Sequence, residues 1–375
     1  MDFELSDDVK GAIARAKDFA DKYFTEEIAE RADSEEQFPS DIVAISKKEK
    51  ILDFSNPWQV LVTIEELVRR DPGLGISVTI SAFGAEIFMF FGNDAQKEKY
   101  MNPVFAGKKS LGLGVTEASG GSDVASITTE AKLDGDSYIL NGGKMFISNG
   151  QIADNFLVLA RTSPAPSPEK KHRGLSVFVV DAKSPGFGIN KLHGKLGVRA
   201  TNTAELIFDN VRVPKENMVG EEGKGFYYIM TFFNISRIYV AAQGLGIAHG
   251  ALDRLIEYSK KYADHSETGE LKEDMQLAIA EIATRVEATR NITYKAASYL
   301  FKFTPNPIVT SMAKFYAAES AVFSTQKAME LMSLHGLTSD LERFFRDAKI
   351  LDIWEGTTEV EKLIITRMML KEGGA

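Results

Sequence analysis

The spacing of apolar residues changes its period twice along the chain, and this change constrains the fold more than any other feature. In residues 1–108 apolar side chains recur at helical spacing, as at Ala16, Phe19 and Ala20. From Ser110 onward, short β-branched and aromatic runs alternate with Gly, Asn and Asp, a pattern typical of strands and tight turns. Beyond this region the helical spacing returns and continues to the end. The pattern therefore predicts helices, then a sheet, then helices again.

We expect an α+β multidomain protein with three parts. The N-terminal helical domain is assigned to residues 1–108, the central antiparallel β-domain to residues 109–217, and a C-terminal helical domain to residues 218–375. Strand-like runs on both sides of Asp134-Gly135-Asp136 predict a β-hairpin. One apolar stripe in the C-terminal part is interpreted as the core face of a helix. Its residues are Met312, Phe315, Tyr316, Val322, Phe323 and Met329.

Composition excludes several classes of function. The 375 residues contain 44 Lys and Arg against 53 Asp and Glu, a net charge of −9, which argues against a nucleic-acid partner. The chain has no cysteine, so disulfides, thiolate catalysis and Cys-ligated metals are excluded. None of the five histidines belongs to an i,i+4 pair or a ligand cluster, so we expect no metal site.

The chain also gives little indication of membrane insertion or export. Its N-terminus has neither the basic nor the apolar region of a signal peptide. The most apolar stretch, Gly225–Leu252, contains Asn234, Arg237, Gln243 and His249, so we interpret it as a buried bundle helix rather than a membrane span. We therefore expect a cytoplasmic protein without a membrane span.

Two motifs in the β region have residue types suited to ligand binding. The segment from Thr116 to Asp123 is rich in small residues, so its backbone can approach a ligand and its N–H groups can hold an anion. A tight loop with an Asp cap explains this segment equally well. In the second motif, Phe146 and Ser148 fall on one face of a strand, an aromatic plane beside a hydroxyl that suits a flat ring. Ordinary alternation on a half-buried strand is the other interpretation.

Two charged residues of the C-terminal part are candidates for chemistry. Arg237 stands alone among apolar residues of a predicted buried helix, where it needs either an anionic ligand or an internal carboxylate. Glu355 follows Trp354 and precedes Gly356, in a position where a raised pKa would suit a general base. An ordinary loop glutamate near a helix N-terminus is the alternative.

Five segments follow one another in a characteristic order and spacing. They are Val115-Thr116-Glu117 with Gly121-Ser122-Asp123, Asn141-Gly142 with Lys144 and Ile147-Ser148-Asn149, Lys195-Leu196-Gly197-Val198-Arg199, Val213-Pro214 with Asn217-Met218-Val219-Gly220, and Arg346-Asp347-Ala348-Lys349 with Glu355-Gly356-Thr357. Together they resemble the acyl-CoA dehydrogenase family over essentially the whole chain. The resemblance implies an N-terminal helical domain, a central β-domain and a C-terminal four-helix bundle.

The resemblance also implies an activity, FAD-dependent desaturation of the α,β bond of an acyl-CoA thioester. A glutamate at the position of Glu355 would remove the α-proton while the β-hydrogen leaves as hydride to flavin N5. Some branches of the family place the base at the position of Ser236, which cannot accept that proton. The family pattern assigns FAD contacts to Leu113, Val115, Thr116, Ser122, Phe146, Ser148, Thr357 and Glu359. It assigns substrate contacts to Ser122, Asn234, Arg237 and Gly356.

The family pattern further implies an electron-transferring flavoprotein as partner, a role in fatty-acid metabolism and a homo-oligomer, either a dimer or a dimer of dimers. The usual motifs that hold FAD across a subunit interface are changed in this chain. The residues at those positions are Tyr262, His265, Ser266, Glu330 and Leu334. These changes predict weaker or differently held FAD, and they leave open a non-catalytic binding or assembly protein. A reductase or oxidase on the same scaffold is a further alternative, and the acyl chain cannot be read from the sequence.

Overall fold

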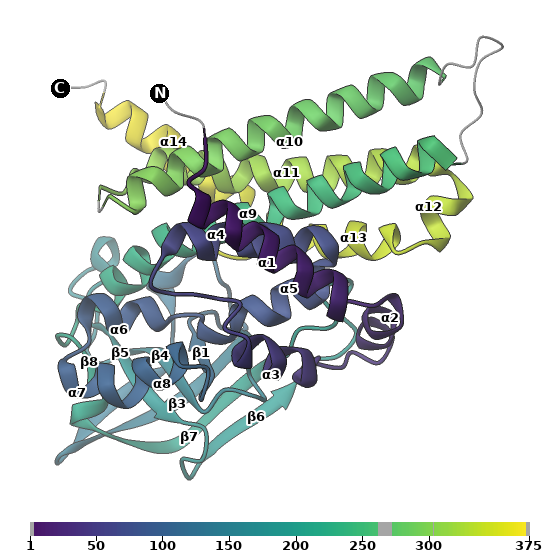
Figure 1. Cartoon of the computed structure of the whole chain (residues 1–375). Helices are drawn as coiled ribbons and strands as arrows, with labels where there is room; N and C mark the ends of the chain where they lie inside the picture. Colours follow the sequence, from purple (N-terminus) through teal and green to yellow (C-terminus); the bar gives the residue numbers. More distant parts are fainter. Residues whose placement is uncertain (1–3, 262–271, 303, 373–375) are drawn as a thin grey trace. The chain divides into compact units, whose positions relative to one another are not determined.

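The computed structural model describes residues 4–261, 272–302 and 304–372. The chain packs into two compact units. The first contains Met1–Val78, Leu196–Ala200 and Asn234–Ala375, and the second contains Thr79–Lys195 and Thr201–Phe233. Figure 1 shows the element order, helices followed by strands followed by long helices, as the sequence predicts. The boundaries expected at residues 108 and 217 stay a prediction.

The first unit is helical. Its helices are α1 (Asp7–Tyr23), α2 (Glu26–Ser34), α3 (Ser40–Lys48), α4 (Pro57–Arg70), most of α5 (Pro72–Thr79), most of α9 (Gly225–Lys261), α10 (Glu273–Leu300), α11 (Pro307–Met332), α12 (Leu334–Thr338), α13 (Leu341–Ala348) and α14 (Thr358–Glu372). The start of α4 follows from local sequence, because the Asn56 side chain accepts hydrogen bonds from two backbone N–H groups and Pro57 occupies the first turn. The buried face of α1 includes Ala12, Ala16 and Phe19 at helical spacing.

Helix α9 packs against its neighbours at backbone distance. A Cβ atom added at Gly244 would lie 2.8 Å from the carbonyl oxygen of Ala317 in α11. One added at Gly246 would lie 2.5 Å from the carbonyl oxygen of Glu65 in α4. Only glycine fits at such separations, so these positions bring α4, α9 and α11 together and place the polar residues of α9 inside the bundle.

The predicted core stripe of α11 is wrong in its details. Met312, Phe315, Tyr316, Val322, Phe323 and Met329 are all half-buried. The fully buried positions of this helix carry mainly small residues such as Ala313, Ala317 and Ala321, together with Lys314. Small side chains let the neighbouring helices approach closely, so the larger apolar side chains flank the contact instead of filling it.

The second unit is built on an eight-stranded sheet whose residues are all described. Its order is β6-β7-β3-β2-β4-β5-β8, with β1 pairing β4. The strands are β1 (Leu111–Gly114), β2 (Glu130–Asp134), β3 (Ser137–Ser148), β4 (Asn155–Arg161), β5 (Leu175–Asp181), β6 (Phe187–Lys191), β7 (Thr203–Pro214) and β8 (Met218–Val219). Short helices α6 (Ala85–Phe91), α7 (Asp94–Gln96) and α8 (Asn102–Phe105) precede them. Pairing is antiparallel except where β1 and β2 meet β4.

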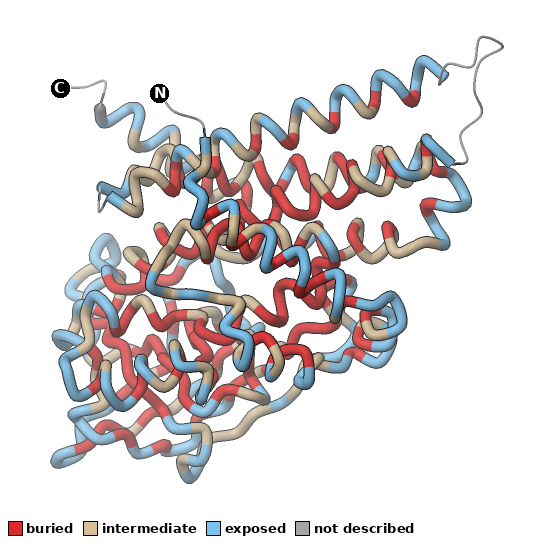
Figure 2. The backbone as a smooth tube through the Cα atoms, viewed as in Figure 1, coloured by how far each residue is buried: buried red, intermediate tan, exposed pale blue. Residues whose placement is uncertain are grey.

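The sheet confirms the predicted hairpin and has a continuous apolar core. Strands β2 and β3 pair antiparallel, with Asp134 opposite Ser137, so Gly135 and Asp136 form the two-residue turn. The core includes Leu140, Phe156 and Phe178, all fully buried. Figure 2 shows buried residues along these strands, and also along the helices of the first unit. The sheet thereby provides a rigid base for the loops at its strand ends.

One segment has the length and hydropathy of a membrane-crossing helix, and it is not the one considered from the sequence. Pro72–Phe91 reaches a mean hydropathy of 1.8 in its most apolar window, and 67 % of that window is buried. The segment is divided into α5, a 3₁₀ turn (Ile80–Ala82) and α6. A buried core segment passes the same test, so this is weak evidence for a span.

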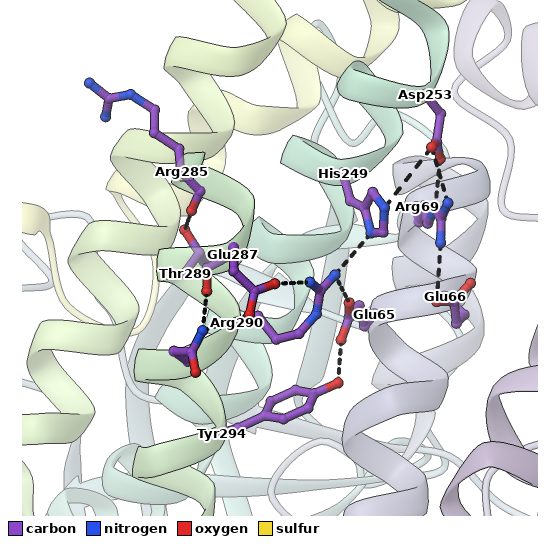
Figure 3. A network of polar contacts seen from close by, with 11 residues as sticks. Glu65, Glu66, Arg69, His249, Asp253, Arg285, Glu287, Thr289, Arg290 and Tyr294 are labelled. Carbon is purple, nitrogen blue, oxygen red and sulfur yellow. Dashed lines mark hydrogen bonds and ion pairs between the residues drawn. The ribbon is translucent and has the colours of Figure 1, made fainter. Parts of the chain in front are cut away.

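A buried ionic network joins α4, α9 and α10 in the first unit (Figure 3). The Glu65 carboxylate accepts hydrogen bonds from the Tyr294 hydroxyl at 2.8 Å and from Arg290 at 3.3 Å. Arg290 lies 3.2 Å from Nδ1 of His249. Burial, and the nearby charge of Arg69, lower the pKa of His249 to about 4, so this histidine is neutral at pH 7.

Candidate active site

A tight turn holds Glu355 between a 3₁₀ turn (Lys349–Asp352) and the start of α14. Glu355 has φ of 55° and Gly356 has φ of 102°, both in the left-handed region. A glutamate rarely adopts this conformation, so the surrounding contacts must hold it. The Thr357 hydroxyl accepts from the backbone N–H of Val360 at 3.3 Å and so caps the N-terminus of α14.

Cations on two helices hold the backbone of this turn. Nε of Arg237, on α9, donates to the carbonyl oxygen of Glu355 at 2.9 Å. Nζ of Lys314, on α11, donates to the carbonyl oxygen of Gly356 at 2.5 Å. The hydroxyl of Ser236 donates to the Glu355 carboxylate itself. Backbone and side chain of the glutamate are therefore positioned by different groups.

Four ionisable side chains gather around the turn. Arg237 Nε also lies 2.9 Å from the carboxylate of Glu361, on α14, whose side chain is fully buried. Burial raises the pKa of Glu355 to about 7, although the Ser236 hydrogen bond and the charges of Arg237 and Lys314 oppose it. Burial likewise lowers the pKa of Lys314 to about 8. The site thus combines two carboxylates and two cations, of which Arg237, Lys314 and Glu361 are buried and Glu355 is half-buried.

Several predicted site residues meet in this unit. Gly356 and Arg237 contact the Glu355 turn, and Arg237 has an internal carboxylate partner, one of the two possibilities left open by the sequence. Asn234 is half-buried on α9, one turn before Ile238, and Glu359 is exposed on the first turn of α14. The remaining predicted residues lie in the second unit.

In the second unit a buried ion pair organises the small-residue loop after β1. Nζ of Lys144, 1 % exposed, lies 2.9 Å from the carboxylate of Glu117, which is 5 % exposed. The backbone N–H and hydroxyl groups of Thr128 and Thr129 donate to the same carboxylate at 2.6–2.9 Å. Burial disfavours ionised Glu117, yet Lys144 and these donors hold its pKa at about 2. The loop that carries Thr116 and Ser122 is therefore anchored at its base.

An irregularity in β3 presents an aromatic face. The register with β7 shifts between Lys144 and Ile147, and Phe146 in this bulge has φ of 61°. Phe146 is 67 % exposed, Ile147 is buried and Ser148 is half-buried. The bulge interrupts the regular alternation of the strand, so the shared face of Phe146 and Ser148 stays a prediction. Leu113 and Val115 are buried, Thr116 is half-buried and Ser122 is exposed.

The altered motif positions are only partly described. Tyr262, His265 and Ser266 lie outside the described residues. The Glu330 carboxylate accepts from Gln326 at 3.0 Å and pairs with Lys327 at 3.8 Å, and Leu334 is 72 % exposed. Within the described ranges, no group of three or more His, Asp or Glu side chains is placed to hold a metal ion.

Three family models cover most of the chain. They are described as the N-terminal, middle and C-terminal domains of acyl-CoA dehydrogenase, and they match residues 6–108, 112–211 and 223–370. The chain belongs to the acyl-CoA dehydrogenase family. It is an oxidoreductase with the fold expected from the sequence, and FAD is its cofactor, as in other members of the family.

Individual relatives agree with this assignment. The short-chain specific acyl-CoA dehydrogenase of Clostridium acetobutylicum is 34 % identical over 98 % of this chain and 99 % of its own. The caffeyl-CoA reductase-Etf complex subunit CarC of Acetobacterium woodii is 33 % identical over 95 % of this chain and 97 % of its own. The structure of butyryl-CoA dehydrogenase from Megasphaera elsdenii superimposes with a TM-score of 0.92, covering 99 % of this chain and 100 % of that one at 33 % identity.

The side chains of the second unit fit a flavin. The Phe146 ring, 67 % exposed, offers a stacking plane, and the half-buried Ser148 two residues further on offers a hydroxyl. In the loop after β1, Gly120 has φ of 154°, a conformation that favours glycine, and the space beside its Cα is open, since a Cβ atom there would meet nothing within 4 Å. An anionic cofactor can therefore approach the loop backbone closely.

Reasoning from the sequence missed four residues of these arrangements. Lys314 lies within the apolar stripe expected for α11 and was given no role. A lysine between Ala313 and Phe315 is itself a signal of a buried cation. Glu361 follows Glu355 by less than two helical turns and carried no distinguishing pattern. Glu117 and Lys144 belong to the quoted motifs but received no role, because their pairing depends on the fold.

Proposed function

We propose that the protein catalyses α,β-dehydrogenation of an acyl-CoA thioester, with Glu355 as the base that removes the α-proton. The observation that carries this proposal is the Glu355 carboxylate, whose pKa is raised to about 7 by burial. Glu355 lies in a left-handed turn, in which Arg237 binds the carbonyl oxygen of Glu355 and Lys314 binds that of Gly356. A base that titrates near neutral pH can both accept a proton and release it in each turnover.

The remaining residues would bind and orient the substrate. Ser122, Asn234, Arg237 and Gly356 would contact the thioester and its CoA arm. The backbone N–H of Glu355 would donate to the thioester oxygen, where negative charge develops as the α-proton leaves. Removing one donor of this kind typically costs about 10²–10³ in rate.

The cofactor would contact the residues that the family pattern assigns to it. Leu113, Val115, Thr116, Ser122, Phe146, Ser148, Thr357 and Glu359 are proposed to hold it. Bound FAD supplies the acceptor for the hydride that leaves the β-carbon. We further propose an electron-transferring flavoprotein as redox partner, which the CarC relative of a reductase-Etf complex supports. A cytoplasmic location and a homo-oligomer, a dimer or a dimer of dimers, complete the proposal.

The test is the variant Glu355→Gln, which keeps the side-chain shape and removes the base. Its visible spectrum should show FAD bound as in the wild-type protein. Anaerobic addition of acyl-CoAs of increasing chain length should bleach the wild-type flavin with one chain class. In the variant the rate of bleaching should fall by about 10²–10⁴.

The matched control is Glu319→Gln, the same change at a carboxylate on α11 that is 44 % exposed and pairs with Lys362. It should bleach at the wild-type rate. Near wild-type bleaching by Glu355→Gln would show that another group is the base. A wild-type protein that binds FAD but is not reduced by any acyl-CoA would contradict the proposed direction of the reaction.

The opposite direction is the second candidate, because CarC is a subunit of a caffeyl-CoA reductase-Etf complex. In that case the acid form of Glu355 would donate a proton to the α-carbon of an enoyl-CoA. The pKa near 7 permits this role equally well. Mixing photoreduced protein with enoyl-CoAs and following flavin reoxidation decides whether this direction is the faster one.

A further inference from the structure

Two buried charges of opposite sign flank the Glu355 turn without belonging to any established contact with substrate or cofactor. Lys314 contributes a fully buried side chain from α11, and its Nζ donates to the carbonyl oxygen of Gly356 at 2.5 Å. Glu361 contributes a fully buried carboxylate from α14, 2.9 Å from Nε of Arg237. Burying either charge is costly, so their retention at this turn calls for a purpose beyond packing.

Among the described residues, the charged groups that act most strongly on Glu355 come from three helices. Arg237 comes from α9, together with the hydroxyl of Ser236. Lys314 comes from α11 and Glu361 from α14. Asp352, in the 3₁₀ turn before Glu355, acts on Lys314 and is joined to Thr358 by a hydrogen bond of 3.2 Å. With Glu355 ionised, the carboxylates of Glu355 and Glu361 balance the charges of Arg237 and Lys314, and protonation of Glu355 removes one negative charge from these four side chains.

We propose that Glu361 and Lys314 are positioning residues that tune Glu355 in opposite directions, Glu361 favouring its protonated form and Lys314 its ionised form. This inference rests on the proposed function of Glu355 as the base. Glu361 also pairs with Arg237, which limits how strongly that arginine attracts the base. Neither residue touches the reacting atoms, and each acts on Glu355 through its own charge.

The two residues predict shifts of opposite sign. In Glu361→Gln one negative charge disappears, so ionised Glu355 becomes more favourable and its pKa should fall. In Lys314→Met one positive charge disappears, so the pKa of Glu355 should rise. A charge within about 4–6 Å of a carboxylate shifts its pKa by about 1–3 units. A merely structural role would lower stability in both variants without moving the titration in opposite directions.

Two readouts test the inference on the FAD-loaded protein. The first is the pH profile of flavin bleaching by the acyl-CoA that reduces the wild-type protein. The second needs no turnover: an infrared titration of protein carrying ¹³C-labelled glutamate, with the Glu355 band identified by its loss in Glu355→Gln. The midpoint pH of the bleaching profile and that of the infrared titration should both fall by about 1 pH unit or more in Glu361→Gln. Both should rise in Lys314→Met.

The exposed pair Lys362 and Glu319, 2.6 Å apart, offers matched controls. Lys362→Met and Glu319→Gln make the same chemical changes on the same two helices, and both midpoints should stay within about 0.3 unit of wild type, since screened surface charges interact weakly. Equal midpoints in wild type and Glu361→Gln would overturn the inference, as would shifts of the same sign in both buried variants.

Failure of this inference can be separated from failure of the proposed function. If Glu355→Gln abolishes bleaching while Glu361→Gln leaves both midpoints unchanged, the base assignment stands and the tuning role is wrong. If Glu355→Gln keeps wild-type bleaching, the base assignment itself is wrong. Thermal unfolding of each variant accompanies the titrations, and if Lys314→Met does not fold, Glu361→Gln alone decides the sign.

Discussion

The buried pair of Lys144 and Glu117 makes a prediction whose magnitude follows from the structure. Lys144→Met keeps the approximate length of the side chain and removes its charge, leaving the Glu117 carboxylate buried with only the Thr128 and Thr129 donors. The pKa of Glu117 lies at about 2 instead of its ordinary 4.5, so the fold favours its ionised form, whereas burial lowers the pKa of Lys144 to about 8. Removing one partner of a buried ion pair costs about 3–5 kcal/mol, because the other charge stays buried without its partner. We expect Lys144→Met to lose about 3 kcal/mol of unfolding free energy.

The loss should depend on pH in a definite sense. Glu117 has a lowered pKa in the folded protein, so its contribution is complete above pH 4.5 and disappears as the pH falls toward 2. In the variant the folded pKa of Glu117 is higher, because Lys144 no longer lowers it, so acid removes less stability. The difference in unfolding free energy between the wild-type protein and Lys144→Met should therefore be largest at neutral pH and should become smaller below pH 4.5.

Urea unfolding at several pH values, followed by circular dichroism, measures the difference. Hydrogen exchange of the segment from Leu111 to Pro214 assigns it to the sheet unit. The control is Lys132→Met, because Lys132 pairs with Glu130 at 2.7 Å but is 72 % exposed, and a loss below about 1 kcal/mol is expected. A Lys144→Met variant within about 1 kcal/mol of wild type at pH 7, or a loss that is constant with pH, would refute the reasoning.

Three further predictions concern single positions. Gly356→Ala should lower turnover and should lower the unfolding free energy by about 1–3 kcal/mol in urea unfolding. The reason is that Gly356 has φ of 102° and that an added Cβ atom would lie 2.2 Å from the Glu361 carboxylate. Wild-type turnover together with wild-type stability would contradict this prediction. Burial and nearby Asp71 raise the pKa of Asp347 to about 7 from its ordinary 3.8, so stability should fall as the pH rises from about 4 to 7, and Asp347→Asn should flatten that fall in a series of thermal melts. Phe146→Ala should weaken FAD retention on gel filtration while the melting temperature of the apoprotein hardly changes, because the ring is 67 % exposed; unchanged FAD binding would exclude a stacking role.

Much of the fold could be read from local sequence. The hairpin at Gly135 and Asp136 and the order of helices and strands depend on residues a few positions apart, and the structure confirms both. The resemblance of the motifs also identified the family correctly. Glu355 and Phe146 were singled out by their sequence neighbours, and their roles stay proposals.

The surroundings of those residues were decided only by tertiary structure. Arg237 and Glu355 are 118 positions apart, and Lys144 and Glu117 are 27 apart. No local pattern states which carboxylate a buried cation will meet, because that depends on how helices and strands pack. The buried face of α11 shows the same limit: hydrophobicity pointed to its large side chains, whereas close helix contact requires the small ones. Sequence determined which elements form and which motifs they carry, and packing determined the charges around Glu355, because burial and long-range pairing set a carboxylate's pKa.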